Sequence, residues 1–134
     1  MDTWIIIGII VVLIILFGLY VAFYRKKRLS NNDIKRVKKV WKEVLDLQKN
    51  NPEQAILRAD KLLDHALKQA GYQGTMGEKL KAARHCFSNN HAIWSAHKLR
   101  NRIAHELGIH LTQQQVVGGL KGFKKAFYDL GIKL

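Results

Sequence analysis

The segment WIIIGIIVVLIILFGLYVAFY, from Trp4 to Tyr24, determines the first element of the fold. It holds no charged residue, and an α-helix of this length, rising about 1.5 Å per residue, spans a hydrocarbon core of about 30 Å. Trp4 at one end and Tyr20 and Tyr24 at the other suit the two membrane interfaces, where aromatic side chains gather. The sequence therefore predicts a transmembrane helix over residues 4–24.

Four basic residues follow this segment and predict its orientation: Arg25, Lys26, Lys27 and Arg28. Because basic flanks stay in the cytoplasm, residues 1–3 are predicted to lie outside and the rest of the chain inside. The alternative is a cleaved signal peptide, which needs a basic start, a shorter apolar stretch and small residues at the cleavage site. Here Asp2 precedes the span, and the RKKR sequence stands where cleavage would occur. We therefore favour a single-pass signal-anchor with a cytoplasmic C-terminal domain.

The charge of the chain lies almost entirely after the apolar segment. The 134 residues include 23 Lys and Arg against 10 Asp and Glu, a net charge of +13, and only Asp2 of the charged residues precedes Arg25. Such a domain favours anionic partners, namely anionic lipid, RNA or another polyanion. The one cysteine, Cys86, excludes an intrachain disulfide and a C-x-x-C metal site. We predict no cofactor and no metal.

Basic residues are densest directly after the membrane segment. Residues 25–32 form a basic juxtamembrane linker, and the outer face of the helix that follows is basic as well. Such a cluster beside a membrane helix is typical of contact with anionic lipid, and it suits nucleic acid too. The residues predicted to make this contact are Arg25, Lys26, Lys27, Arg28, Lys35, Arg36, Lys38, Lys39 and Lys42.

Residues 33–134 are predicted to fold as an all-α domain, a four- to five-helix antiparallel bundle. Apolar residues recur at helical spacing throughout, with a single proline and no alternating β-branched run. The first helix covers about residues 33–49, and the second begins after an Asn51 N-cap and ends at Gly71. Capping boxes at Thr75 and Thr112 begin the third and fifth helices, and the fourth covers about residues 91–107. Glycines 118 and 119 of the fifth helix predict close packing against a neighbour.

The fourth of these helices carries two stripes. Ile93, Ala96, Ile103 and Leu107 fall on one side and form the predicted core stripe, and Arg100 projects from it. A second, polar ridge lies on a different side of the helix and is formed by Trp94, His97, Asn101 and His105. This helix therefore presents two imidazoles, an amide and an indole beside an arginine.

These side chains suit the cleavage of RNA by its own 2′-hydroxyl. Histidine accepts or donates the proton near neutral pH, arginine holds phosphate oxygens, and the asparagine orients either group. A structural interpretation stays open: Arg100 can pair with Asp60 or Asp64, His105 can cap the helix terminus, and Trp94 can be a core residue. A zinc site on His97 and His105 is disfavoured, because two helical turns separate them.

The sequence from Arg100 to His105 reads R-N-x-x-x-H and resembles the signature of the HEPN family, the higher eukaryote and prokaryote nucleotide-binding domain. The stretch from Asn51 to Ala66 resembles an early helix of that family, and the likeness covers roughly residues 52–130. The resemblance implies a helical bundle of four or five helices with the motif late in the chain. It also implies that Arg100 holds phosphate, His105 acts as acid or base, and Asn101 orients.

The resemblance implies a metal-independent endoribonuclease, because many members of that family have this activity and pair their domains so that two motifs share one cleft. We therefore expect a homodimer through the polar ridge. Trp94 and His97 are auxiliary members of this ridge and do not belong to the motif. Other members look non-catalytic, and the alternative is therefore a membrane-bound module that binds RNA, nucleotide or a protein partner without cleaving.

Overall fold

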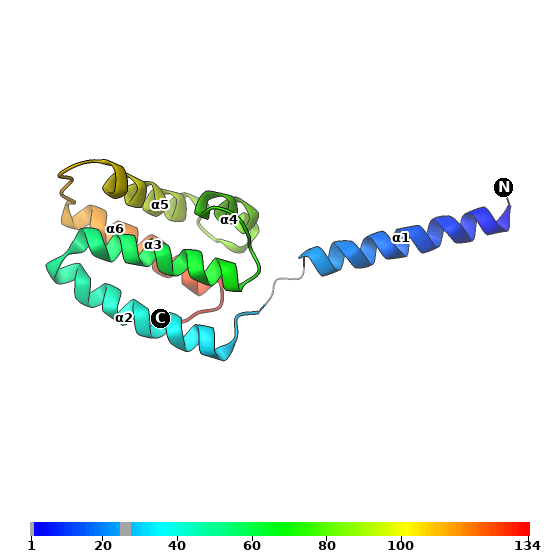
Figure 1. The fold of residues 1–134 in the computed structure, drawn as a ribbon, viewed down its shortest axis with the longest axis horizontal. Coiled ribbons are helices and arrows are strands. Elements are labelled where there is room, and N and C mark those ends of the chain that lie inside the picture. The colour runs from blue at the N-terminus through cyan, green and yellow to red at the C-terminus, as the bar shows by residue number, and fades with distance from the viewer. Residues whose placement is uncertain (1, 25–27) are drawn as a thin grey trace.

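The computed structural model describes residues 2–24 and 28–134, and within them all regular structure is helical (Figure 1). The all-α prediction is confirmed for this part of the chain. The elements are α1 (Thr3–Tyr24), α2 (Asn31–Asn50), α3 (Pro52–Gln69), α4 (Met76–Ala82), a 3₁₀ turn η1 (Arg84–Cys86), α5 (Asn90–His105) and α6 (Gln113–Asp129).

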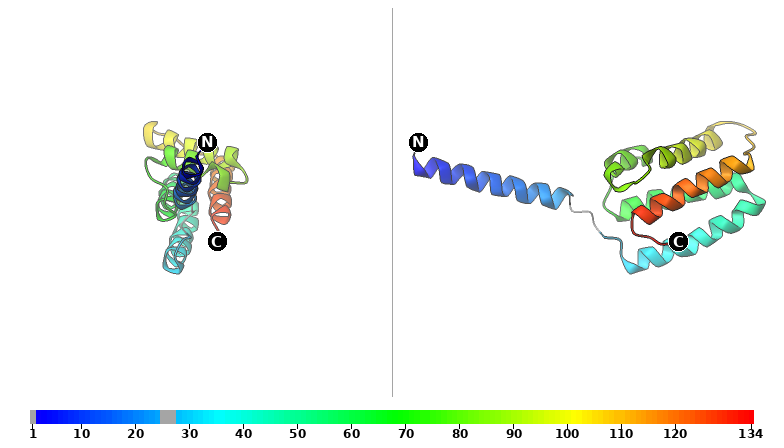
Figure 2. Two further views of the ribbon diagram at one scale, coloured as in Figure 1. Left: turned by 90° about the vertical axis from the view of Figure 1, so that its right-hand side faces the viewer. Right: turned by 180° about the vertical axis from the view of Figure 1, so that it is seen from behind.

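Helix α1 stands apart from the other helices in Figure 1 and in the right-hand view of Figure 2. Its segment from Thr3 to Ala22 is long and apolar enough to cross a membrane, and none of it is buried inside the molecule. A helix with these properties near the N-terminus fits a membrane span and also a signal sequence. Its large apolar side chains need an apolar environment that the other helices do not supply.

The helix starts follow the capping residues in the sequence. Asn51 accepts a hydrogen bond from the backbone of Gln54, with Pro52 at the first helical position. Thr75 and Thr112 form the two predicted capping boxes, with Glu78 and Gln115 respectively. Helix α2 begins earlier than predicted, at Asn31, because the Ser30 hydroxyl accepts from the backbone of Asp33 and so caps the chain two residues upstream.

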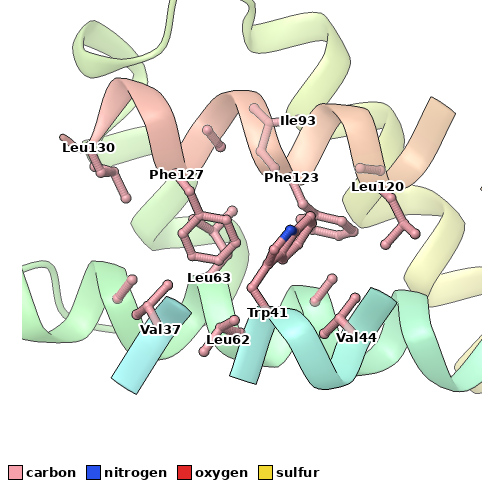
Figure 3. Packing of buried hydrophobic residues seen from close by; sticks show 14 of the residues in the cluster. Val37, Trp41, Val44, Leu62, Leu63, Ile93, Leu120, Phe123, Phe127 and Leu130 are labelled. Carbon is pink, nitrogen blue, oxygen red and sulfur yellow. The ribbon is translucent and has the colours of Figure 1, made fainter. Parts of the chain in front are cut away.

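Helix α3 is the centre of the domain. It packs against α2 on one side and against both α5 and α6 on the other, and α5 and α6 pack together. Trp41 of α2 meets Phe127 of α6 edge to face, with ring centroids 5.6 Å apart. Figure 3 shows both rings beside Leu63 of α3 and Phe123 of α6, and the last two are fully buried. These four side chains join three helices into one core.

Close contact between α5 and α6 depends on glycines of α6. A Cβ on Gly122 would lie 2.8 Å from the carbonyl oxygen of Ala92. A Cβ on Gly119 would lie 3.2 Å from Leu99 of α5 and 2.8 Å from Ile56 of α3. The predicted close packing is therefore correct for Gly119 and wrong for Gly118, whose Cβ would meet nothing within 4 Å. Gly122, which the sequence argument passed over, makes the closer backbone approach.

Helix α5 ends at His105, two residues before the predicted end. Glu106 adopts an extended backbone with ψ 127°, and its N–H still bonds to the carbonyl of Arg102. Leu107, predicted to extend the core stripe, therefore leaves the helix and is fully exposed. The helix predicted from the sequence ends directly before Gly108. In the structure a turn that begins at Glu106 separates the helix from Gly108, which has φ +66°, so the predicted helix end was two residues too late.

Candidate functional site

The carboxylate of Asp60, on α3, is the centre of a polar cluster between α3 and α5. It is 3% exposed, so it must find partners inside the protein. One oxygen lies 2.8 Å from Nδ1 of His97, and the other lies 3.4 Å from Nε of Arg100. The pairing of Arg100 with an acid of the preceding helix, one of the two interpretations of the sequence, is thus present in the structure.

Asn101 closes this cluster into a ring. Its side-chain oxygen accepts a hydrogen bond from Nη1 of Arg100 at 3.0 Å, and its amide nitrogen lies 3.4 Å from Nε2 of His97. The ring is consistent if His97 donates through Nδ1 to Asp60 and accepts through Nε2 from Asn101. Asp60, His97, Arg100 and Asn101, which we call the Asp60 ring, therefore orient one another, and the guanidinium has two neighbours that fix its plane.

The polar ridge predicted on one open side of the helix is not open along its length. His97 is buried, with 8% of its surface exposed. Trp94 is partly buried, packs against the core, and meets the His97 ring edge to face at 6.0 Å. The α4 helix covers this part of the ridge, because Gly77 lies against the Trp94 ring. Periodicity placed these residues on one side of α5 correctly, and the short helix above them was not foreseen as a cover.

His105 lies outside the Asp60 ring. It is the last residue of α5 and is exposed, and it forms no hydrogen bond or ion pair within the described part of the chain. The three motif residues are thus divided: Arg100 and Asn101 belong to the ring, and His105 stands about one turn further on, free to meet a ligand or a second molecule. The last turn of α5 is also the place that a structural cap would occupy.

An open groove of about 820 Å³ borders the Asp60 ring between α3, α4 and α5. We call it the motif groove; it is lined by Leu57, Asp60, Lys61, Asp64, Thr75, Met76, Gly77, His97, Arg100 and Ala104. The side chain of Arg100 is 37% exposed, so its outer part reaches this groove while its Nε is buried. The groove can therefore offer a guanidinium to an anion, although two aspartates share its wall.

Lys79 is a component of this region that sequence reasoning missed. It is 5% exposed, and its Nζ lies 2.7 Å from Asp64 on α3, so the pair ties α4 to α3 beside the Asp60 ring. The spacing carried a signal: Lys79 stands four residues before the buried Ala83 and next to Leu80, on the inner side of the short helix. A lysine on an inward face needs a carboxylate partner, and Asp64 of α3 supplies it.

The basic residues predicted for lipid or nucleic-acid contact lie along α2 where they are described. Lys35, Arg36, Lys38, Lys39 and Lys42 are all exposed, and so is Arg28 in the segment before the helix. They alternate with the buried Val37, Trp41 and Val44, so α2 is apolar toward α3 and basic toward solvent. Arg25, Lys26 and Lys27 lie outside the described residues.

In residues 2–24 and 28–134 no three His, Cys, Asp or Glu side chains gather as a metal site would require. No protein-family model matches the chain, and no curated protein or solved structure gives a significant match. The likeness to the HEPN family therefore stays a prediction that rests on the motif residues themselves.

Proposed function

We propose that the chain is a single-pass, membrane-anchored HEPN-like domain, an antiparallel helical bundle held on the cytoplasmic side, that cleaves RNA without a metal ion. The observation that carries the proposal is the orientation of Arg100 by Asp60 and Asn101 at the edge of an open groove, with an exposed histidine one turn further along the same helix. An oriented guanidinium and a free imidazole are what the attack of a 2′-hydroxyl on the adjacent phosphorus needs.

In the proposed reaction the 2′-oxygen of RNA attacks the adjacent phosphorus, and the bond from phosphorus to the 5′-oxygen breaks. His105 takes the proton of the 2′-hydroxyl, and Arg100 holds the charge that develops on the phosphate oxygens. The leaving 5′-oxygen must receive a proton, which the His105 of a second copy supplies in a homodimer whose axis lies near the exposed end of α5. The products are a 2′,3′-cyclic phosphate and a 5′-hydroxyl.

The test uses the full chain in nanodiscs of neutral lipid, incubated with RNA in EDTA. We expect cleavage that leaves a 2′,3′-cyclic phosphate, and a loss of roughly 10²–10⁴-fold in His105→Ala. The matched control is His110→Ala, which removes another exposed histidine a few residues away and should cleave normally. RNA that survives the wild-type protein, or equal cleavage by His105→Ala, would overturn the proposal.

A second function, binding of RNA, nucleotide or a protein partner without cleavage, is favoured by a different observation. Both Arg100 and His97 already have partners within the Asp60 ring, so the ring has a structural role whether or not a substrate binds. Arg100→Lys separates the two functions, because lysine keeps the charge and loses the planar fork. Arg102→Lys on the exposed side of α5 is its control. If the domain is a non-enzymatic module, RNA should bind to the wild-type protein, and Arg100→Lys and Arg102→Lys should not differ in RNA cleavage.

We also propose that α2 lies against an anionic membrane surface through five of its exposed basic residues, Lys35, Arg36, Lys38, Lys39 and Lys42. Each basic residue near an anionic leaflet contributes about 1 kcal/mol, and the effect is screened by salt. Amide hydrogen exchange of α2 should therefore slow in nanodiscs that contain anionic lipid, and the difference should vanish at high salt. Equal exchange in neutral and anionic nanodiscs would contradict this orientation.

The proposed cytoplasmic location of the domain has its own test. A reporter that works only outside the cytoplasm, fused after Leu134, should be silent.

A further inference from the structure

A second groove runs along the opposite side of α5, between α5 and α6. It consists of two connected hollows of about 810 and 320 Å³ that share Ala92 and Gly118. We call it the α5–α6 groove. From Gln114 at one end to Tyr128 at the other it extends about 20 Å along α6. It is therefore long enough for an extended chain and not only for a small molecule.

The charge of this groove has one sign. Lys121, Lys124 and Lys125 line its larger hollow, and no described residue that lines either hollow is acidic. Lys121 and Lys124 form no ion pair with any described residue. The nearby Asp129 lies 3.5 Å from Lys125, but its carboxylate already accepts hydrogen bonds from Ser88. Two lysines are thus left without a counterion beside a concave surface.

An exposed aromatic ring stands at the cationic end. Tyr128 is 57% exposed and lines the same hollow, and Nζ of Lys125 lies 5.1 Å from its ring centroid. The other end is lined by uncharged hydrogen-bonding side chains, among them Ser95, Gln114 and Gln115. Lysines that hold a backbone and an aromatic ring on which a base stacks are the components of sequence-tolerant single-strand binding.

The floor of the groove gives a reason for Gly118, which close helix packing does not explain. Gly118 lies in the interior of α6, where glycine weakens a helix, and a Cβ there would meet nothing within 4 Å. It is the residue shared by both hollows, together with Ala92. A larger side chain at this position would divide the groove without touching the core. The absence of a side chain keeps the two hollows continuous.

We propose that single-stranded RNA binds along the α5–α6 groove, with its phosphates at Lys121 and Lys124 and a base stacked on Tyr128. This proposal rests on the proposed action of the chain on RNA, and it adds where the strand lies. The motif groove is a poorer place for a polyanion, because Asp60 and Asp64 lie in its wall. A concave groove with a stacking ring suits a strand better than it suits the flat surface of a bilayer.

The first experiment blocks the groove without loosening the fold. Full-length protein in neutral nanodiscs is titrated into a short fluorescein-labelled oligouridylate, and binding is followed by anisotropy. Gly118→Leu should abolish or strongly weaken binding while its unfolding temperature rises, because leucine is the better helix former and the space is open. Unchanged binding by this variant would overturn the proposal, and loss of stability cannot mimic the expected result.

The second experiment removes the unpaired charges and follows the salt dependence. The double variant Lys121→Gln, Lys124→Gln should flatten the slope of log K against log salt by about 1.4, since each phosphate contact on a single strand contributes about 0.7. The matched control Lys38→Gln, Lys39→Gln removes the same charge from the exposed face of α2 and should leave the slope unchanged. Equal flattening in both double variants would show only a general attraction and would overturn the groove.

The third experiment tests stacking and separates this proposal from catalysis. Tyr128→Leu should weaken binding by about 5- to 150-fold, and Tyr128→Phe should restore it. Deoxyoligothymidylate should bind in the same groove, because neither lysines nor a stacking ring need a 2′-hydroxyl, so binding remains measurable even if RNA is never cleaved. Protection of α6 amides by anionic lipid, with no protection by RNA, would assign the groove to the membrane and overturn the proposal.

Discussion

The two sides of helix α5 are built by different means. Toward α3 and α4 the contact consists of charged and hydrogen-bonding side chains: the Asp60 ring and, beside it, Lys79 with Asp64. Toward α6 the contact consists of small residues, where Ala92 and Ala96 pack against Gly122. One side is thus specified by charge and hydrogen bonding, and the other by shape. We therefore expect different kinds of substitution to destabilise the two sides.

The difference also bears on function. On the side held by charges, most polar groups already have partners, so a ligand meets the outer part of Arg100 and the exposed His105. On the side held by shape, Lys121 and Lys124 form no ion pair with a described residue and remain available to an anion. Binding and chemistry are therefore proposed on opposite sides of one helix.

The largest effect is expected from removal of the charge at the centre of the ring. Asp60→Ala leaves Nδ1 of His97 without its hydrogen-bond partner and removes the carboxylate that faces the buried Nε of Arg100. Breaking a buried pair on one side costs about 3–5 kcal/mol, and the partial exposure of Arg100 places the expected loss at about 3 kcal/mol. Denaturant unfolding of the full chain, followed by tryptophan fluorescence, measures it.

The matched control for this substitution is Asp46→Ala on α2. Asp46 is exposed and has no ion pair among the described residues, so its loss should change the free energy of unfolding by less than about 0.5 kcal/mol. Asp60→Asn should lose less than Asp60→Ala, because its side-chain oxygen still accepts from His97. If Asp60→Ala and Asp46→Ala are equally stable, the ring contributes nothing to the fold and the contrast between the two sides of α5 fails.

A smaller effect is expected from a volume change on the other side. Gly122→Ala places a Cβ 2.8 Å from the carbonyl oxygen of Ala92, and a backbone oxygen cannot rotate away. Forcing α5 and α6 apart costs about 1–3 kcal/mol, from which the better helix propensity of alanine recovers about 1 kcal/mol. The free energy of unfolding should therefore fall by up to about 2 kcal/mol, measured in the same denaturant titration.

The control one turn earlier reverses the sign. Gly118→Ala adds the same methyl group to the same helix where nothing lies within 4 Å. It should raise the free energy of unfolding by up to about 1 kcal/mol. A loss of stability at both glycines would mean that the helix propensity of α6, and not its contact with α5, is what the glycines determine.

These contrasts show what the sequence contains and what it leaves out. The helix starts at Asn51, Thr75 and Thr112 follow from local capping chemistry, and the structure has them where the sequence predicts them. The position of His97 on one side of α5 follows from periodicity. The burial of this side of α5 does not follow from periodicity, because α4 covers it. No local sequence rule places that short helix over Trp94.

The same limit applies to the charged partners. The sequence identified Asp60 and Asp64 as possible partners of Arg100 and could not choose, since both lie on one face of α3 one turn apart. The choice depends on Lys79, which pairs with Asp64 and leaves Asp60 to Arg100 and His97. Leu107 shows a different limit of sequence analysis. The apolar spacing of α5 continues to Leu107 in the sequence, but the helix ends at His105 and Leu107 is exposed.

The smallest expected effect concerns two nearly identical capping boxes. In α4 the backbone N–H of Thr75 donates to the Glu78 carboxylate at 2.7 Å, and in α6 the backbone N–H of Thr112 donates to the neutral Gln115 side chain at 2.9 Å. The hydrogen bond from the Thr75 backbone, with a second contribution from the Thr75 side chain, holds the pKa of Glu78 below its usual range. The box beside the motif groove is thus charged, and the box at the α5–α6 groove is not.

A carboxyl whose pKa is lowered on folding binds fewer protons in the folded state than in the unfolded state. Its contribution to stability is therefore complete above the unfolded pKa of 4.5 and is lost as the pH falls through the lower, folded value. Glu78→Gln should make the free energy of unfolding less dependent on pH below about 5, because glutamine keeps an acceptor and does not titrate. Gln115→Glu should introduce the same dependence at the start of α6. Parallel pH profiles for the wild type and both variants would show that neither box responds to acid, and the contrast between a charged and an uncharged side of α5 would then be confined to the Asp60 ring.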